Sequence, residues 1–502
     1  MGQRQRRATS QISNGKAPPS TLTLLFLTLI AAVYIGAMLL QPVEIYDEGL
    51  IVSGAEQVLH GHRPYLDFNT AYPPGQFYTI AFVFRMFREG LLAERIWDSI
   101  WRLGIVAASF WLGYELWGKE MNPLPLLCCI TLVGGIGYRL YPMVTATLPC
   151  LCALSCTLRF LGKRNLHWIF GSGLLLGCTA LYRHDLAACA GIVVLGSVLR
   201  NRVAIIRLVG GVLLVAGPVV AYLLITIPRH VLWQSFFEFP KLNAAARHIP
   251  LMSLTHDRSS FLSLVLWPIA IIASAATRVL RGPASERAPI AVVVLTAGLT
   301  WILATQRLDI LHAFPSVMIC LIILAGNVLP NVGHGMLIAL ALFLYGFKPA
   351  DRWKHQLLTL KLTQTSAISR ADSVRIPSDQ ADAIRYLQAH LPTGNKVYVG
   401  TTSHSHVLTN DALFPFLAER PLATRHYMWI PGFTNSLPVQ SEIVKELKSN
   451  NVQYVVLFDA PTSTEENLSS VDSGVTLLDE YLKRNYREVA VSSRYHILQR
   501  VF

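Results

Sequence analysis

Two adjacent carboxylates, Asp47 and Glu48, follow closely on an apolar run that extends from Thr21 to Leu40. A charge so near a long apolar stretch needs a partner or a function, because placing it beside lipid is costly. Such a pair can accept a proton, hold a divalent cation or orient a hydroxyl group. The same pair is also consistent with a solvated helix N-terminus, where the helix dipole stabilises acidic side chains.

Further clusters combine a cation with a carboxylate where other apolar runs begin or end. They contain Arg183 and Asp185, then Arg307, Asp309 and His312, and, at positions i, i+3 and i+7, Arg95, Asp98 and Arg102. The last spacing puts the three side chains on one helix face, so we expect a polar stripe facing a chamber. Arginine there suits a phosphate headgroup. Structural pairing at helix ends is the alternative, because an arginine near lipid needs a partner.

A polar and aromatic loop follows the carboxylate pair and extends to Glu94. It includes the sequences Gly61-His62-Arg63-Pro64-Tyr65-Leu66-Asp67-Phe68 and Tyr72-Pro73-Pro74-Gly75. The two prolines end one helix and allow another to begin, so the segment from Gln76 to Phe87 is predicted to lie along a membrane interface. A second loop, from Pro228 to Ser260, is a candidate substrate flap. Its polar residues include Glu238, Lys241, Arg247, His248, His256, Asp257 and Arg258.

The amino-acid composition indicates that the helices that position these residues lie in a membrane. Of the 502 residues, 52% are hydrophobic and only 15% are charged, which is too apolar for an ordinary soluble surface. The formal charge is +13, but basic residues in short loops between apolar runs indicate topology and not nucleic-acid binding. The eight cysteines fall inside apolar runs without zinc-ligand spacing and are interpreted as small buried side chains.

The apolar runs predict about ten or eleven helical spans. They lie near residues 21–40, 95–117, 123–138, 143–161, 167–181, 186–199, 205–227, 261–275, 289–305, 311–329 and 332–347. About twenty residues are needed to cross the hydrocarbon layer. The first run has that length, which is too long for a signal peptide, so we expect an uncleaved first span behind a basic cytoplasmic tail over residues 1–20.

Counting from a cytoplasmic N-terminus satisfies the positive-inside rule. The basic residues that fall inside are Lys163, Arg164, Arg202, Arg207, Arg278, Arg281 and Arg287. The same count places the loops 41–94 and 228–260, and everything after Lys348, outside the plasma (inner) membrane. The prediction is a polytopic α-helical membrane domain over residues 21–347, a linker over 348–376, and a small soluble extracytoplasmic α/β domain over 377–502.

The last segment has the pattern of a small α/β module. Ser378 is a predicted N-cap for a helix with Ala381, Ile384, Leu387 and Leu391 on one face. A helix over residues 441–450 and strands over 396–400, 452–458, 486–492 and 495–501 are expected to follow. We find neither a dinucleotide-binding fingerprint nor a Walker loop in this module.

The first outer loop resembles that of the GT-C membrane glycosyltransferases, in the branch of the protein O-mannosyltransferases and lipid A aminoarabinose transferases. In that branch an Asp-Glu pair follows the first span. A Gly-x-x-Pro-Tyr-x-Asp-Phe stretch and a Pro-Pro-Gly before an interfacial helix come next. The resemblance covers most of residues 41–102 and, more loosely, the helical region to about residue 347.

The resemblance implies a sugar donor carried on a polyprenyl phosphate and an inverting transfer at the outer face. Asp47 is the expected general base, and Glu48 is expected to orient the acceptor or to complete a metal site. Donor phosphate or sugar is expected at Arg63, Arg95, Arg102, Arg183, Asp185, Arg307, Asp309 and His312. Acceptor contacts are expected at Tyr65, Asp67, Tyr72 and Lys241. A divalent cation at the carboxylate pair is the one cofactor left open.

A transporter or flippase of a lipid-linked sugar is the alternative function, since many spans and a basic cavity would also serve it. Coupled transporters usually carry ionisable residues in mid-membrane, in broken helices related by an internal repeat. Here the charges cluster at outer helix ends and we see no repeat, which favours a hexosyl- or pentosyltransferase. A non-catalytic sugar-binding scaffold would not need both carboxylates. The partners expected are the bilayer, the lipid-linked donor and an acceptor that is a protein, a lipid or a glycan, and no nucleic acid.

Overall fold

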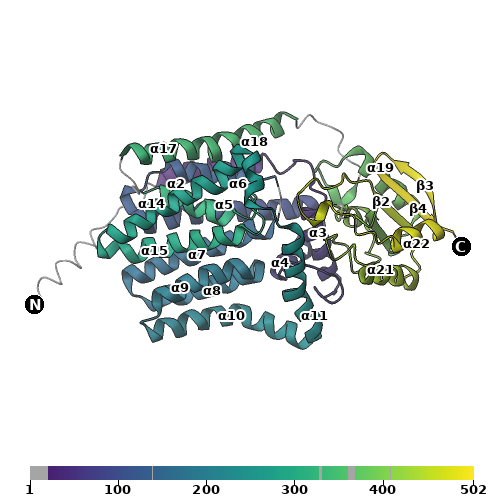
Figure 1. Ribbon diagram of the computed structural model, residues 1–502, viewed down its shortest axis with the longest axis horizontal. Coiled ribbons are helices and arrows are strands. Elements are labelled where there is room, and N and C mark those ends of the chain that lie inside the picture. The colour runs from purple at the N-terminus through teal and green to yellow at the C-terminus, as the bar shows by residue number, and fades with distance from the viewer. Residues whose placement is uncertain (1–20, 138–139, 327–330, 360–367, 407–408, 502) are drawn as a thin grey trace, which may run out of the picture.

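The computed structural model describes residues 21–137, 140–326, 331–359, 368–406 and 409–501. Each predicted apolar run contains a helix. In chain order these helices are α2 (Thr21–Gly36), α5 (Leu91–Trp117), α6 (Leu124–Gly135), α7 (Pro142–Lys163), α8 (Leu166–Tyr182), α9 (His184–Val198), α10 (Arg202–Thr226), α14 (Trp267–Arg281), α15 (Ala284–Ala304), α16 (Phe314–Leu324) and α17 (Asn331–Ala341). They lie roughly parallel in one bundle, with the C-terminal domain at one end (Figure 1). We call that end the domain end.

Four helical segments among the described residues are long and apolar enough to cross a membrane by length and composition: Pro142–Lys163, Arg202–Thr226, Arg258–Arg281 and Ala284–Ala304. Shorter apolar helices surround them. Helix α7 is central, with 78% of its apolar window buried, whereas only 17% of the α10 window is buried. The side chains of Leu213 and Ile225 on α10 are correspondingly exposed. An apolar helix that is exposed over most of its surface is stable only when lipid covers it.

The two long loops are helical in part. The first contains α3 (Asp47–Leu59) and α4 (Gly75–Met86), and α4 begins after the two prolines as predicted. It buries Phe77, Ile80 and Phe84 on one face and exposes Phe82 and Met86 on the other, which fits an interfacial helix. The second loop contains α11 (Arg229–Trp233), η2 (Gln234–Glu238), α12 (Phe239–Arg247), η3 (Leu251–His256) and the start of α13 (Arg258–Phe261), which continues through η4 (Leu262–Leu266) into α14.

The segment predicted as a linker is helical over its first part. Helix α17 continues through η5 (Leu342–Phe347) into α18 (Lys348–Thr359). Trp353 stacks on Tyr34 of α2 with ring centroids 4.6 Å apart, and its indole N–H donates to the Tyr34 carbonyl at 2.9 Å. This packing explains why the helix extends past the apolar run. Helix α19 (Ser378–His390) begins beyond η6 (Ser369–Ala371).

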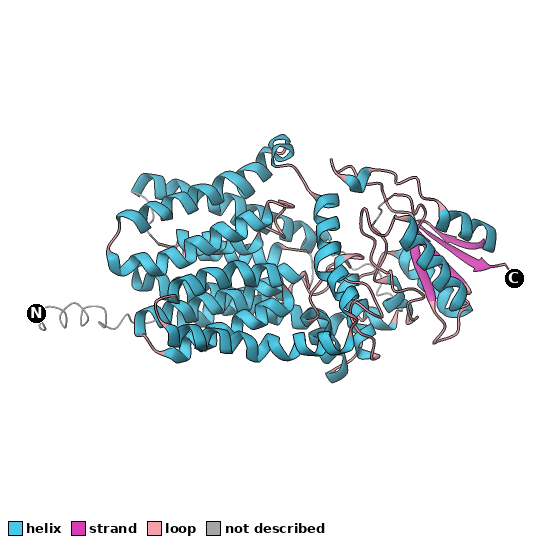
Figure 2. Cartoon of the chain, turned by 60° about the horizontal axis from the view of Figure 1, so that its bottom comes forward, coloured by secondary structure: helices cyan, strands magenta, loops and turns pink. Residues whose placement is uncertain are grey.

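The C-terminal domain is a small sheet with helices packed against it (Figure 2). Its elements are β1 (Val397–Thr401), α20 (Phe414–Ala418), α21 (Leu437–Ser449), β2 (Tyr454–Phe458), η7 (Leu468–Ser470), α22 (Leu477–Asn485), β3 (Tyr486–Ser492) and β4 (Tyr495–Arg500). The domain contains both predicted helices and all four predicted strands, and in addition α20, η7 and α22, which were not predicted. The sheet order is β1-β2-β4-β3, with β1 parallel to β2 and the other pairs antiparallel. The predicted N-cap was wrong by one residue, because the cap position is Pro377 and Ser378 is already helical.

The C-terminal domain shares a hydrophobic core with the first loop. Leu50 and Ile51 of α3 are buried in one cluster with Leu413 and Phe416. A Cβ atom on Gly49 would lie 2.5 Å from the backbone nitrogen of Leu413, so only glycine allows this approach. Helix α3 is therefore held between the bundle and the domain, with its first turn at the boundary.

Candidate active site

The first turn of α3 is fixed by a reciprocal arrangement of carboxylates. The Glu44 side chain accepts hydrogen bonds from the backbone N–H groups of Asp47 and Glu48, the latter at 3.1 Å. The Glu48 side chain in turn accepts from the backbone N–H of Glu44 at 3.0 Å. This is the logic of a capping box, in which two side chains satisfy free N–H groups at a helix start. It leaves the Asp47 side chain free to point elsewhere.

Glu48 faces the protein interior. Its carboxylate receives two hydrogen bonds from Arg95 of α5, at 2.7 and 2.9 Å, and both side chains are fully buried. Arg95 also donates to the carbonyl oxygens of Leu39 and Gln41, at 2.9 and 2.5 Å. Glu48 and Asp47 therefore do not form a joint site, and the pair Glu48–Arg95 ties α3 to α5.

The predicted polar stripe on α5 does not face a chamber. Arg102 pairs with Asp98 at 2.7 Å and donates to the carbonyl oxygens of Val133 and Ile136, at 2.6 and 2.8 Å. Both side chains are at most 5% exposed. Arg95 and Arg102, the predicted phosphate contacts on this helix, thus do not line the cavity, because nearby carboxylates and backbone carbonyl oxygens at helix ends bind both guanidinium groups.

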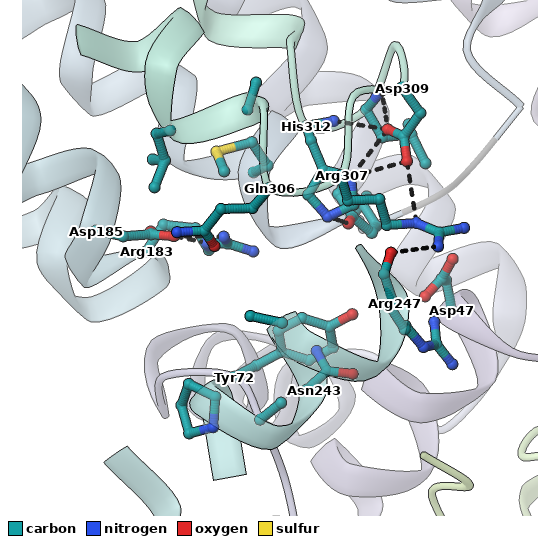
Figure 3. Close-up of a pocket in the computed structure, with 18 of the residues that line it drawn as sticks. Asp47, Tyr72, Arg183, Asp185, Asn243, Arg247, Gln306, Arg307, Asp309 and His312 are labelled. Atoms are coloured by element: carbon teal, nitrogen blue, oxygen red, sulfur yellow. Dashed lines mark hydrogen bonds and ion pairs between the residues drawn. The ribbon is translucent and has the colours of Figure 1, made fainter. Parts of the chain in front are cut away.

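A cavity of about 440 Å³ lies at the domain end of the bundle (Figure 3). It is enclosed by α3, α12, the start of α7 and the loops after α8 and α15. Its polar lining residues are Tyr46, Asp47, Tyr72, Tyr141, Arg183, His184, Asp185, Asn243, Arg247, Gln306, Arg307, Asp309 and His312. Met428 and Ile430 of the C-terminal domain complete the wall. The structure thus brings Asp47 together with both loop clusters that the sequence singled out.

Asp47 and the residues after α15 share one side of the cavity. Figure 3 shows the Asp47 carboxylate beside the side chains of Arg247 and Arg307. Arg247 reaches in from the end of α12, with one terminal nitrogen 3.5 Å from the Tyr46 hydroxyl. Its Nε atom is buried and has no hydrogen-bond partner among the described residues. A guanidinium group placed in this way is ready to bind an anion.

The Asp47 carboxyl is strongly perturbed by this environment. Burial raises the pKa of Asp47 to about 6, and Asp309 adds to the increase. The positive charges of Arg247 and Arg307 and the His312 side chain oppose it. Burial and the neighbouring Asp47 likewise raise the pKa of Glu44, to about 8. A carboxylate with a pKa near 6 is both ionised at neutral pH and basic enough to accept a proton in a transition state.

Asp309 organises the loop between α15 and α16. Its carboxylate accepts from the backbone N–H groups of Leu311 and His312, both at 2.9 Å, and from the His312 Nδ1 atom at 2.9 Å. Because Nδ1 donates, Nε2 of a neutral His312 is an acceptor, and it lies 3.0 Å from the Tyr141 hydroxyl. Asp309 also lies 3.3 Å from Nε of Arg307. The predicted Asp-x-x-His cluster is therefore one connected unit.

Arg183 and Asp185 form the other polar end of the cavity. They are joined by two hydrogen bonds of 2.9 and 2.5 Å, and the Asp185 side chain caps α9 through the backbone N–H of Leu186 at 2.8 Å. Gln306 lies between this pair and the Asp47 side in Figure 3. The cavity thus has arginine and aspartate side chains at both ends, with a polar amide between them.

The other predicted acceptor and donor residues fall outside the cavity, with the exception of Tyr72. Arg63 and Asp67 pair with each other at 3.1 Å across a turn that is partly exposed. Tyr65 lies in that turn with a positive φ of 73°, and its buried hydroxyl donates to the Tyr72 carbonyl at 3.0 Å. Lys241 is exposed on α12. These residues shape the loop that carries Tyr72 and do not line the pocket.

Several cavity residues carried no assigned role in the sequence. Arg247 stood among many polar residues of a loop, Tyr141 and Gln306 flanked apolar runs, and Asn243 gave no signal. An amphipathic reading of residues 239–247, with Asn243 and Arg247 at i and i+4, would have placed both on one face of α12. Among the described residues there is no group of three or more His, Cys, Asp or Glu side chains that could hold a metal ion.

No known family and no curated protein matches the sequence. Solved structures do match its fold. ArnT from Cupriavidus metallidurans bound to undecaprenyl phosphate superposes with a TM-score of 0.62 at 14% identity, covering 96% of this chain and 99% of that one. The same enzyme in the apo state gives a TM-score of 0.58 at 14% identity, with coverage of 96% and 98%.

A second neighbour is the arabinofuranosyltransferase AftD from Mycobacteria, with a TM-score of 0.52 at 11% identity. The match covers 97% of this chain and 40% of AftD, so the chain spans less than half of that protein. Both neighbours are GT-C glycosyltransferases. The resemblance indicated by the first loop is therefore confirmed at the level of the fold.

Proposed function

We propose that this protein is a membrane glycosyltransferase that moves a sugar from a polyprenyl-phosphate donor to an acceptor at the outer face of the membrane. The observation that carries the proposal is the cavity in which the Asp47 carboxylate, with its pKa raised to about 6, lies beside the unpaired Nε of Arg247. A base and an anion site side by side are what transfer from a phosphate leaving group to a hydroxyl requires.

The reaction we propose is a single inverting displacement. The acceptor oxygen attacks the anomeric carbon of the sugar while its proton passes to the Asp47 carboxylate. The bond between the anomeric carbon and the phosphate oxygen breaks, and the electron pair leaves with the polyprenyl phosphate. General base catalysis supplies about 10²–10⁴-fold, or roughly 3–5 kcal/mol.

Arg247 and Arg307 are the residues we assign to the phosphate, because both point into the cavity on the Asp47 side. Charge that develops on the leaving phosphate is stabilised most strongly by fixed cations in a site with little water. Arg183 with Asp185, and Gln306, would then contact the sugar or the acceptor from the opposite end. Arg95 and Glu48 act at a distance, by holding α3 against α5.

Two further observations support a lipid-linked donor. The cavity lies where the apolar helices end, so a polyprenyl chain could remain in lipid while its phosphate enters the site. ArnT, whose fold this chain shares, was solved with undecaprenyl phosphate bound. The basic residues Lys163 and Arg202 lie at the opposite helix ends, which favours an outer position for the cavity and the C-terminal domain.

The test is sugar release from a panel of polyprenyl-phosphate sugars by the purified protein in nanodiscs, with and without a chelator. We expect turnover with at least one donor and its loss in Asp47→Asn. Asp185→Asn is the matched variant in the same cavity, and it should change donor or acceptor affinity more than the rate of bond cleavage. Chelator sensitivity would assign a cation to the site.

Transport of the lipid-linked sugar without its consumption would contradict the proposal. If no donor is consumed while labelled lipid-linked sugar crosses the bilayer of reconstituted vesicles, the protein is a flippase and the transferase proposal is wrong. Each variant should unfold at the same temperature as the wild-type protein, which is the control for folding.

A further inference from the structure

The C-terminal domain contacts one of the cavity arginines, Arg307, through the loop that carries Glu465. The two Glu465 carboxylate oxygens lie 2.8 and 2.6 Å from the two terminal nitrogens of Arg307. This is a bidentate pair, the same geometry with which arginine binds a phosphate. The guanidinium group that the proposed function assigns to the donor phosphate is thus already occupied by a carboxylate of the protein.

Arg307 has little capacity left for a second anion. Its Nε faces Asp309 at 3.3 Å, and one terminal nitrogen also donates to the Arg247 carbonyl at 3.4 Å. All three nitrogens therefore contact protein oxygens. These contacts engage four of its five N–H groups, so a phosphate can form a bidentate pair with Arg307 only if one of the two carboxylates moves away.

Glu465 is the carboxylate that is easier to displace. Asp309 is fixed by two backbone N–H groups and by the His312 ring. Apart from Arg307, the Glu465 side chain accepts only from Asn467 Nδ2, at 2.9 Å, among the contacts of the described residues. Its side chain is 35% exposed, so release into water costs little desolvation energy.

The loop around Glu465 contacts the helix that carries the second arginine assigned to the phosphate. Asn467 caps the short helix η7 through the backbone N–H of Ser469 at 2.9 Å, and η7 packs against α12. Helix α12 carries Arg247, the other arginine beside Asp47. A movement of this loop would therefore change the environment of both phosphate-binding arginines.

We propose that Glu465 is an intramolecular competitor of the donor phosphate, and that the loop of residues 463–470 is a latch that opens when a phosphate takes its place on Arg307. The inference rests on the proposed function, because the anion that displaces Glu465 is the phosphate of the lipid-linked donor. Before binding, the latch keeps Arg307 in place through the bidentate pair with Glu465.

The test is the affinity of the full-length protein in nanodiscs for undecaprenyl phosphate. In Glu465→Gln we expect about two- to fivefold tighter binding, because the partly solvated competitor is lost. Glu466→Gln removes the same charge from the adjacent exposed residue and should leave the affinity unchanged. In Arg307→Gln, adding Glu465→Gln should bring no further gain.

A second readout follows the latch itself. Hydrogen exchange in residues 461–471 should become faster when undecaprenyl phosphate binds to the wild-type protein. Unchanged or weaker binding in Glu465→Gln, with wild-type unfolding temperature, would overturn the competitor role. A wild-type protein that does not bind undecaprenyl phosphate at all would instead overturn the proposed function, so the two failures are distinguishable.

Discussion

At the residue scale, the protonation of Asp47 determines whether the site can act. Burial raises its pKa to about 6, and a base must be ionised to accept a proton. We therefore predict that kcat/KM for the donor falls about tenfold per pH unit below pH 6 and levels off above it. The measurement is a pH profile between pH 4.5 and 8. An acidic limb near pH 4 would mean that another group is the base.

Arg247 provides the second prediction at this scale. Its Nε is buried and has no hydrogen-bond partner among the described residues, so this N–H is available to an incoming anion. Arg247→Gln should weaken undecaprenyl phosphate binding by about thirtyfold or more, the usual range for truncating one partner of a buried charge pair. Arg247→Lys should recover part of this, because the charge remains and the fork geometry is lost. Arg229→Gln, an exposed arginine on α11, is the control.

Residue types alone indicated much of this site. Asp47, Arg183, Arg307, Asp309 and His312 were singled out because charges at the ends of apolar runs need a reason, and all five line the cavity. Arginines that serve structure carry the same signal. Besides Glu48 and Asp98, the partners of Arg95 and Arg102 are backbone carbonyl oxygens at the ends of other helices, which no spacing in the sequence reveals.

At the scale of elements, α3 depends on the pair that Glu48 forms with Arg95 in a fully buried position. Glu48→Gln would remove the nearer of the two buried carboxylates beside Arg95 and leave only Glu94, 3.6 Å from Nε, at a cost of up to about 3–5 kcal/mol in unfolding free energy. Asp47→Asn should leave the unfolding temperature unchanged and abolish turnover. Thermal unfolding and turnover of both variants test this contrast. Lost turnover at wild-type stability in Glu48→Gln would make Glu48 a catalytic residue and not a positioning residue.

Element boundaries were predictable wherever a local signal marks them. The prolines before α4 and the aromatic and β-branched residues of β2 and β4 gave their positions to within two residues. The placement of α12 could not be predicted, because it depends on contacts with η7 and with Phe433. The Phe433 ring packs on that of Phe239 with centroids 5.0 Å apart. Such long-range packing explains why Arg247 and Glu465 became visible as site residues only in the folded chain.

At the scale of the whole molecule, the cavity has walls from both halves of the chain. Met428 and Ile430 come from the C-terminal domain, while the acid and the arginines come from the helical bundle and its loops. The shared core around Leu50 and Leu413 makes the domain part of the site's scaffold. Its removal would expose apolar side chains of α3 that are now fully buried. The domain is therefore best understood as a fixed wall with one movable loop.

The orientation of the molecule is the last prediction. Helix α7 begins at the cavity and ends at Lys163, and with 22 residues it extends about 33 Å, enough to cross the hydrocarbon layer. Lys163 and the cavity should therefore lie on opposite sides of the membrane, with the basic end inside. In intact cells, a membrane-impermeant maleimide should label Glu466→Cys, and should label Lys163→Cys only after permeabilisation. The wild-type protein, treated with the same maleimide, is the control for labelling of the native cysteines. The reverse pattern would place the cavity in the cytoplasm, where nucleotide sugars are available, and would remove the main reason for a lipid-linked donor.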